Sequence, residues 1–256
     1  MNRRNFLKLA ALTPIITTDL FATEDNINTY KMTKQDIFLD SYELITLKNI
    51  NNRIKRLKRH VGYANFNIIS FQDSLFYARN YSSIGSFTKE EIKLIERLFY
   101  ENPERYGFYG NKTCENLNNK ISKKDIVKVP RSGHYLFKGK PLDDYTRLRK
   151  DIGKKLILTS GIRNIMKQLS LYCNKIYSNN GNITLASHSI APPAYSYHTT
   201  SDFDVGKKGW GYLNFTKRFE TTAEFKKMRN LEYISMRYTM YNREGVRYEP
   251  WHVKVI

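Results

Sequence analysis

The sequence changes character near Leu156, and this change most limits the folds that the chain can adopt. Residues 155–160 contain the apolar run Leu-Ile-Leu, which predicts a short buried strand, and Gly161 ends it. Apolar side chains between 162 and 176 then recur at helical spacing, and the turn Asn-Asn-Gly at 179–181 closes this helix. The chain after residue 155 is therefore expected to mix strands with helices.

Further elements are predicted near the C-terminus. Residues 233–241 and 246–255 are expected to form two strands around the turn at 242–245. Upstream of them, Thr221 and Glu224 have the spacing of a capping box, which predicts the start of a helix.

The chain before Leu156 is basic and partly helical. Spaced apolar residues over 37–57 predict one helix, and Thr88 with Glu91 three residues later predicts the start of another. The alternation of Phe and Ile over 65–81 favours a short strand. No chemistry is recognisable in this part of the sequence.

The overall charge limits the partners without selecting one. The formal net charge is +19, from 43 Lys and Arg against 24 Asp and Glu. So basic a chain attracts polyanions, and both nucleic acid and a bacterial cell wall are polyanionic. The basic residues are spread along the chain rather than gathered in one arm, so charge alone does not choose between these partners.

The two cysteines, Cys114 and Cys173, are compatible with one disulfide in an exported protein or with two buried thiols. They are too few for a zinc site made of cysteines alone.

The N-terminus resembles an export signal. Arg3 and Arg4 are followed by Asn-Phe-Leu-Lys and then by a mostly apolar run over 9–16, which is too short to span a membrane. Arg-Arg, Phe, Leu and Lys stand at the offsets of the twin-arginine signal, which a receptor of the export machinery reads. We expect residues 1–22 to be this signal, and we expect no stable membrane span after processing.

Two later segments carry the residue types of a metal hydrolase. His198 lies close to Asp202 and Asp204, and His252 follows Glu249 by three residues. A catalytic zinc takes three protein ligands, usually His with a carboxylate, and works with a carboxylate that accepts a proton without binding the metal. These residues therefore predict a zinc site, although Asp202 and Asp204 also suit an ordinary turn.

The same segments resemble the zinc D-Ala-D-Ala carboxypeptidases of the VanY type. Residues 192–198, Pro-Pro-Ala-Tyr-Ser-Tyr-His, are similar to the start of the family's first motif, and residues 249–252, Glu-Pro-Trp-His, match its Glu-x-Trp-His motif. A third motif, Ser-Gly-Tyr-Arg-Ser followed by Gln, resembles residues 160–164 with Gln168. The three motifs stand in the family's order, and the resemblance covers 156–256.

One departure affects the choice of a metal ligand. The family's Asp follows its His by seven positions, whereas Asp204 follows His198 by six, and Ser201 stands where Gly is usual. With the gap placed in the turn, the resemblance makes Asp204 the ligand, and Asp202 is its competitor.

The resemblance implies a role for each matched residue. It implies that the metal ligands are His198, Asp204 and His252, and that Glu249 takes the proton of the attacking water and gives it to the leaving amine. Arg163 is implied as the cation that stabilises the oxyanion. The resemblance further suggests that the residues near the substrate are Ser196, Ser160, Gln168 and Trp251, with Trp251 packed beneath the metal and Gln168 supporting a loop.

The implied fold is α+β, of the Hedgehog/DD-peptidase type, with an antiparallel sheet and flanking helices that carry the zinc site, plus a partly helical N-terminal extension. We therefore divide the chain into a signal over 1–22, a basic and partly helical region over 23–150, and a zinc peptidase domain over 151–256. The implied activity is release of terminal D-Ala from peptidoglycan stem peptides in the periplasm or cell envelope.

Three alternatives stay open. The same zinc chemistry serves an endopeptidase that cuts wall crosslinks, or a dipeptidase. A second alternative is a non-catalytic wall-binding protein with a degenerate site. The shortened motif and Ser201 favour this alternative. A nucleic-acid-binding protein fits the charge, but the export signal and the dispersed basic residues count against it, so no nucleic acid is expected.

Overall fold

The structure, a computed structural model, describes residues 35–256, which lie within one compact unit, so the export signal expected over 1–22 falls outside the described residues. The helices are α2 (Ser41–Val61), α3 (Tyr63–Phe66), α4 (Phe71–Asn80), α5 (Lys89–Tyr100), α6 (Lys140–Ile152), α7 (Ile165–Ser178), α8 (Ile183–Ser187) and α9 (Ala223–Met228). The strands are β1 (Ile126–Lys128), β2 (Tyr135–Phe137), β3 (Leu156–Ser160), β4 (Phe203–Lys207), β5 (Ser235–Met236) and β6 (His252–Lys254). Short 3-10 helices are η3 (Pro103–Tyr106), η4 (Lys123–Asp125), η5 (Tyr197–Thr199), η6 (Gly211–Phe215) and η7 (Lys217–Thr221).

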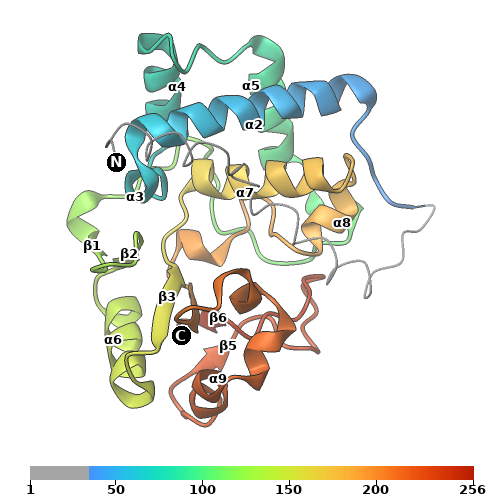
Figure 1. Cartoon of the computed structure of the whole chain (residues 1–256). Helices are drawn as coiled ribbons and strands as arrows, with labels where there is room; N and C mark the ends of the chain where they lie inside the picture. The colour runs from blue at the N-terminus through green and yellow to red at the C-terminus, as the bar shows by residue number, and fades with distance from the viewer. Residues whose placement is uncertain (1–34) are drawn as a thin grey trace, which may run out of the picture. The chain divides into compact units, whose positions relative to one another are not determined.

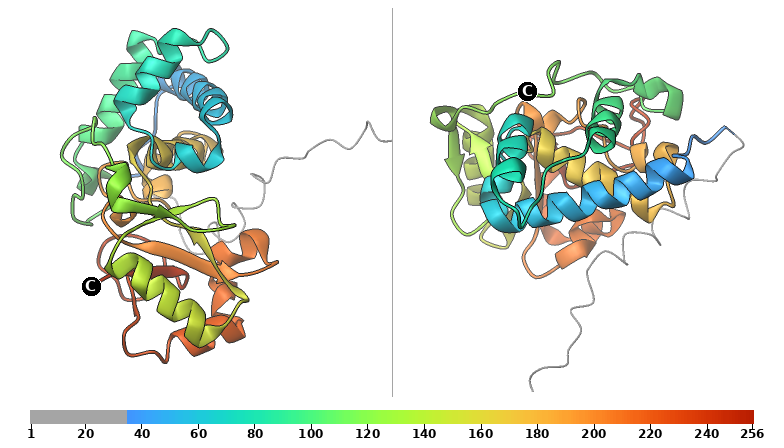
Figure 2. Two further views of the ribbon diagram at one scale, coloured as in Figure 1. Left: turned by 90° about the vertical axis from the view of Figure 1, so that its left-hand side faces the viewer. Right: turned by 90° about the horizontal axis from the view of Figure 1, so that it is seen from above.

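Helices α2, α4 and α5 lie on one side of α7, and the four-stranded sheet with α6 and α9 lies on the other (Figure 1, Figure 2). The apolar faces of α2, α4, α5, α7 and α8 share one hydrophobic core. The sheet, α6 and α9 share a second core, which includes Trp251. Helix α7 therefore stands between the helices and the sheet.

Local signals start the first helices. Asp40, Ser70 and Thr88 cap α2, α4 and α5, and each helix has the reciprocal bond of a capping box. The predicted helices at 37–57 and after Thr88 are confirmed. The strand expected within 65–81 is wrong, because the Ser70 cap starts α4 and its buried side chains then recur at helical spacing.

The sheet has the order β3-β4-β6-β5, and all of its pairs are antiparallel. This confirms the α+β class with an antiparallel sheet and flanking helices. The register pairs Ser160 of β3 with Asp204 of β4, and Asp204 with His252 of β6. Three polar residues thus form a row across the sheet, after a register shift in β3 between Leu158 and Ser160.

The strand predicted at 155–160 and the helix after it are confirmed, but α7 begins only at Ile165, with Asn164 as its N-cap. Gly161 is required between them, because a Cβ there would lie 2.1 Å from the carbonyl oxygen of Tyr135. Arg163 therefore lies in a connection that passes close to β2, and not on a helix surface.

The C-terminal strands are much shorter than predicted over 233–241 and 246–255. β5 and β6 pair, but Pro250 offers no N–H to the ladder, and β6 begins only at His252. The helix predicted after Thr221 is α9, and its N-cap is Thr222, which accepts a hydrogen bond from the backbone N–H of Phe225. The box between Thr221 and Glu224 is therefore wrong by one residue.

Cys114 and Cys173 are both buried free thiols in this structure, which settles the alternative between a disulfide and two thiols. Within residues 35–256, no helix combines the length and hydropathy of a membrane span.

Candidate metal centre

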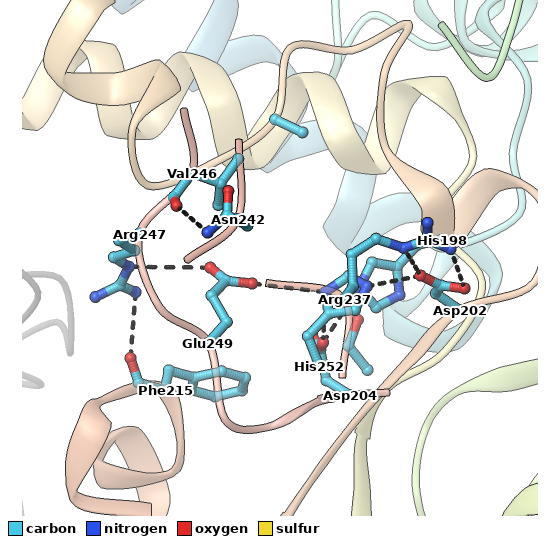
Figure 3. Close-up of polar contacts among 12 residues, drawn as sticks. His198, Asp202, Asp204, Phe215, Arg237, Asn242, Val246, Arg247, Glu249 and His252 are labelled. Atoms are coloured by element: carbon cyan, nitrogen blue, oxygen red, sulfur yellow. Dashed lines mark hydrogen bonds and ion pairs between the residues drawn. The ribbon is translucent and has the colours of Figure 1, made fainter. Parts of the chain in front are cut away.

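Three side chains converge at the row across the sheet. His198, Asp204 and His252 are each at most 3% exposed, and one potential ligand atom of each lies within 4.8 Å of the others. Asp204 Oδ1 is 3.2 Å from His198 Nε2 and 3.4 Å from His252 Nδ1. β4 supplies Asp204, β6 supplies His252, and η5 supplies His198 (Figure 3).

Two atoms of this group lack hydrogen bonds. His198 Nε2 and Asp204 Oδ1 are buried and have no hydrogen-bond partner among the described residues. Buried polar atoms are normally satisfied, so two facing atoms without hydrogen bonds call for an explanation. Two imidazole nitrogens and a carboxylate oxygen are ligands that zinc takes. The donor set therefore fits a zinc ion.

The protonation states agree with this fit for two of the three ligands. Burial lowers the pKa of His198 to about 4, and the nearby Arg163 adds to this, so the imidazole is neutral at pH 7. Burial opposes ionisation of Asp204, but the neighbouring His198 and the Arg163 guanidinium hold the pKa of its carboxyl well below the usual range. A neutral imidazole and a carboxylate are the forms that bind metal.

His252 differs from His198 because carboxylates surround it. Burial alone would lower its pKa, but hydrogen bonds to Asp202 and Glu249 and the charge of Asp204 raise the pKa to about 9. A cation bound at His252 Nδ1 would therefore displace a proton.

The second nitrogen of each histidine is fixed by a contact outside the metal group. His198 Nδ1 lies 2.9 Å from the carbonyl oxygen of Gly161, and His252 Nε2 lies 3.0 Å from Asp202 Oδ2. Such contacts orient metal-binding histidines and select their tautomer. They leave His198 Nε2 and His252 Nδ1 to face Asp204.

Asp202 has a position different from that of Asp204. Its carboxylate accepts hydrogen bonds from Arg237, at 2.7 and 3.1 Å, and from the backbone N–H of Val255, at 3.0 Å. Burial opposes its ionisation, but the bonds from His252 and Arg237 lower its pKa to about 2. Asp202 is thus an anion behind His252, and Asp204 is the aspartate that faces both histidines.

Glu249 lies beside the three converging side chains and outside their group. Its Oε2 is 3.5 Å from His252 Nδ1, and its Oε1 is 3.9 Å from Arg247 Nε (Figure 3). The side chain is buried, and the backbone N–H of Glu249 donates to Tyr238 O at 2.9 Å. Glu249 therefore places a buried carboxylate next to the His252 ring, and its backbone is anchored by a hydrogen bond.

Arg163 lies on another side of Asp204. Its Nη2 contacts Asp204 Oδ2, and its Nε donates to Ser160 Oγ at 2.8 Å. The backbone N–H of Arg163 donates to His198 O at 3.1 Å. These contacts bring a guanidinium to the metal group and fix its direction.

Residues 140–256 match the family model of VanY, D-alanyl-D-alanine carboxypeptidase. This part of the chain belongs to the VanY family. A search among curated proteins gave no match.

Solved structures give distant similarities to this chain. The LdcB LD-carboxypeptidase is 24% identical, with 61% of this chain and 78% of that chain covered and a TM-score of 0.48. A variant of the vancomycin-resistance D,D-pentapeptidase VanY, in complex with Zn(II), is 17% identical, with coverages of 59% and 88% and a TM-score of 0.39. The D,D-dipeptidase VanXYg, in complex with a phosphinate analogue of D-Ala-D-Ala, is 19% identical, with coverages of 59% and 62% and a TM-score of 0.46.

The remaining predicted residues of the VanY-family part lie around the centre rather than in it. The Gln168 amide donates to the carbonyl oxygen of Ala191 at 2.7 Å, so it ties α7 to the loop before His198. Ser196 is buried, and its carbonyl oxygen accepts from Thr113. Trp251 packs in the core of the sheet.

Two residues were missed by the sequence reasoning. Arg237 holds Asp202 and stacks over Tyr197, with its Cζ 3.6 Å from the ring centroid. Tyr238 packs edge-on against the His252 ring at 4.8 Å between centroids. No local sequence pattern identifies either residue, because their contacts depend on how β5 pairs with β6.

Proposed function

We propose that the chain is an exported zinc metallopeptidase that hydrolyses peptidoglycan stem peptides and releases terminal D-Ala. The observation that carries this proposal is the convergence of His198, Asp204 and His252 with Glu249 alongside, in a part of the chain that belongs to the VanY family. His198, Asp204 and His252 hold the metal, and Asp202 orients His252 from behind.

Zinc, when bound to these three residues, supplies a Lewis acid that acidifies water and polarises a carbonyl oxygen. Glu249 accepts the proton of the water as its oxygen attacks the scissile carbonyl carbon. Glu249 then gives this proton to the amide nitrogen as the C–N bond breaks, so that D-Ala leaves with a neutral amine. The new carboxylic acid of the remaining peptide loses the second proton of the water to solvent and is left as a carboxylate.

Arg163 stabilises the negative charge that develops on the carbonyl oxygen. Its guanidinium is already held by Ser160 and Asp204, so little reorientation is needed when this charge appears. Ser160 is thus a positioning residue for Arg163, and Gln168 and Ser196 hold the loop that carries His198.

The proposed location is the periplasm or cell envelope. The stem peptides of peptidoglycan lie outside the cytoplasmic membrane, and Arg3 and Arg4 open a segment that resembles a twin-arginine signal. We keep the division into residues 1–22, 23–150 and 151–256 as part of this proposal.

The experiment is incubation of the purified chain with defined muropeptides, with and without a chelator, followed by mass analysis of the products. Loss of one D-Ala that stops with chelation and returns with Zn²⁺ is the expected result. Cleavage within crosslinks identifies an endopeptidase, and cleavage of free D-Ala-D-Ala identifies a dipeptidase. Absence of any cleavage by the zinc-loaded chain, with Glu249→Ala indistinguishable from it, rejects the enzyme.

A further inference from the structure

A buried lysine follows Arg163 by four residues. Lys167, in the first turn of α7, is only 8% exposed. No carboxylate in the described part of the chain forms an ion pair with it, and its Nζ contacts the Tyr63 ring, 5.4 Å from the centroid. Burial, followed by the charges of Arg163 and Lys58, lowers the pKa of Lys167 to about 7. A buried ammonium without a counterion is costly unless a ligand supplies the anion.

Other residues around Lys167 are also suited to an anion. Lys58 Nζ makes a second cation–π contact with the Tyr63 ring of α3, 4.6 Å from the ring centroid. The side chain of Tyr63 is exposed. His134 is buried edge-on to this ring, and its Nδ1 has no hydrogen-bond partner among the described residues. Burial lowers the pKa of His134 to about 4, so its imidazole is neutral at pH 7, and the charge comes from the two lysines. We call Lys58, Tyr63, His134 and Lys167 the cationic subsite.

The cationic subsite is tied to the segment that carries Arg163. The Ile162 N–H donates to Tyr135 O at 2.8 Å, next to His134. The Asn164 N–H donates to Asn67 O at 2.8 Å, in the connection that follows α3. Arg163, between these two anchors, acts electrostatically on both His134 and Lys167. The subsite therefore adjoins the proposed oxyanion cation.

We infer that the cationic subsite binds the C-terminal carboxylate of the peptide substrate; this inference rests on the proposed function. In a substrate that ends one residue after the scissile bond, the carboxylate carbon is only two bonds from the amide nitrogen. Such a carboxylate supplies Lys167 with its missing counterion. A continuing peptide offers a neutral amide there and leaves the ammonium unpaired, so the subsite favours a carboxypeptidase over an endopeptidase.

This inference also gives the helical region a role. Lys58 and Tyr63 come from α2 and α3, outside the part of the chain that matches the VanY family. The helical region thereby completes the substrate site in addition to packing against α7.

The test measures binding in a chain that does not turn over. Zinc-loaded Glu249→Gln is titrated by calorimetry with N-acetyl-L-Lys-D-Ala-D-Ala and with the same peptide as its C-terminal amide. We expect the acid to bind about 10- to 100-fold more tightly than the amide, the range for a charge-assisted contact. Adding Lys167→Met removes this preference and leaves the Kd of the amide unchanged.

The matched control is Lys175→Met in the same Glu249→Gln chain. Lys175 lies on the same helix and is equally buried, at 8% exposure, so it reports the effect of losing a buried lysine from α7. It is expected to keep the preference for the acid. Lys167→Arg, which retains the charge, is expected to keep most of it.

Three results overturn the inference: equal Kd values for acid and amide, no binding of the acid, or weakening of both peptides alike by Lys167→Met. Hydrolysis by the native chain is scored separately. Cleavage of D-Ala without a preference for the acid rejects the subsite and leaves the proposed function. A binding preference for the acid without any hydrolysis rejects the function alone.

Discussion

The helical cluster of α2, α4 and α5 and the sheet β3 to β6 are stabilised in opposite ways. The helical cluster buries apolar faces, such as Leu47, Ile50 and Ile54 of α2, together with one ion pair, between Arg53 of α2 and Glu91 of α5. The sheet has strands of two to five residues and buries charged groups in its middle. The stability of the helical cluster therefore depends mainly on apolar packing. The stability of the sheet depends more on ion pairs and hydrogen bonds between its buried charged groups.

The buried charges of the sheet form one connected set. Arg237 binds Asp202, Asp202 binds His252, and Asp204 faces His252, His198 and Arg163. Loss of one partner from such a set leaves another buried charge uncompensated. We therefore expect changes in the sheet to alter chemistry, and changes at the apolar core positions of the helical cluster to alter stability alone.

The largest expected effect on chemistry comes from Glu249→Gln. Loss of the general base should lower kcat by about 10²- to 10⁴-fold, while bound zinc stays at one per chain. Steady-state kinetics with a D-Ala-terminated peptide and metal analysis check both parts. Glu224→Gln on α9 removes another buried carboxylate and should leave kcat unchanged. A Glu249→Gln chain with native kcat contradicts the assignment.

The largest expected effect on stability comes from the helical cluster. Ile54→Ala removes a 2% exposed side chain from the face of α2 that packs in the core with α5 and α7. It should lower the free energy of unfolding by about 2–5 kcal/mol, measured by urea denaturation. The kcat of the folded fraction and its zinc content should not change. A tenfold loss of kcat in the folded fraction would break the division between the two regions.

The contrast between the regions also explains what the sequence predicts. Thr88 and Glu91 are three residues apart, so the start of α5 is a local property and was predicted. The pairing of Asp202 with His252 spans 50 residues, and its bond to Arg237 spans 35. Such contacts depend on sheet register, so the sequence could name His198, Asp204 and His252 as candidates but could not assign the place of Asp202.

Asp202→Asn tests the long-range part of the site. The amide cannot accept from Arg237 and His252 as the carboxylate does, so His252 loses its fixed orientation. We expect zinc affinity to fall by about 10- to 100-fold, measured by competition with a chelating dye. Asp204→Asn should abolish tight zinc binding under the same conditions. Equal losses in the two variants would mean that Asp202 is a ligand too.

The smallest expected effect separates local from long-range stabilisation. Thr88→Ala removes the cap that accepts from the Glu91 N–H at 3.2 Å, in an exposed position far from the chemistry. It should cost about 1 kcal/mol of unfolding free energy without altering kcat, and Thr88→Ser should recover most of that loss, because serine caps as well as threonine. Thermal and urea unfolding measure the difference. If Thr88→Ala instead reduced zinc affinity, the start of α5 would be coupled to the sheet through α2 and α7, and the helical cluster would contribute to the order of the metal centre as well as to its support.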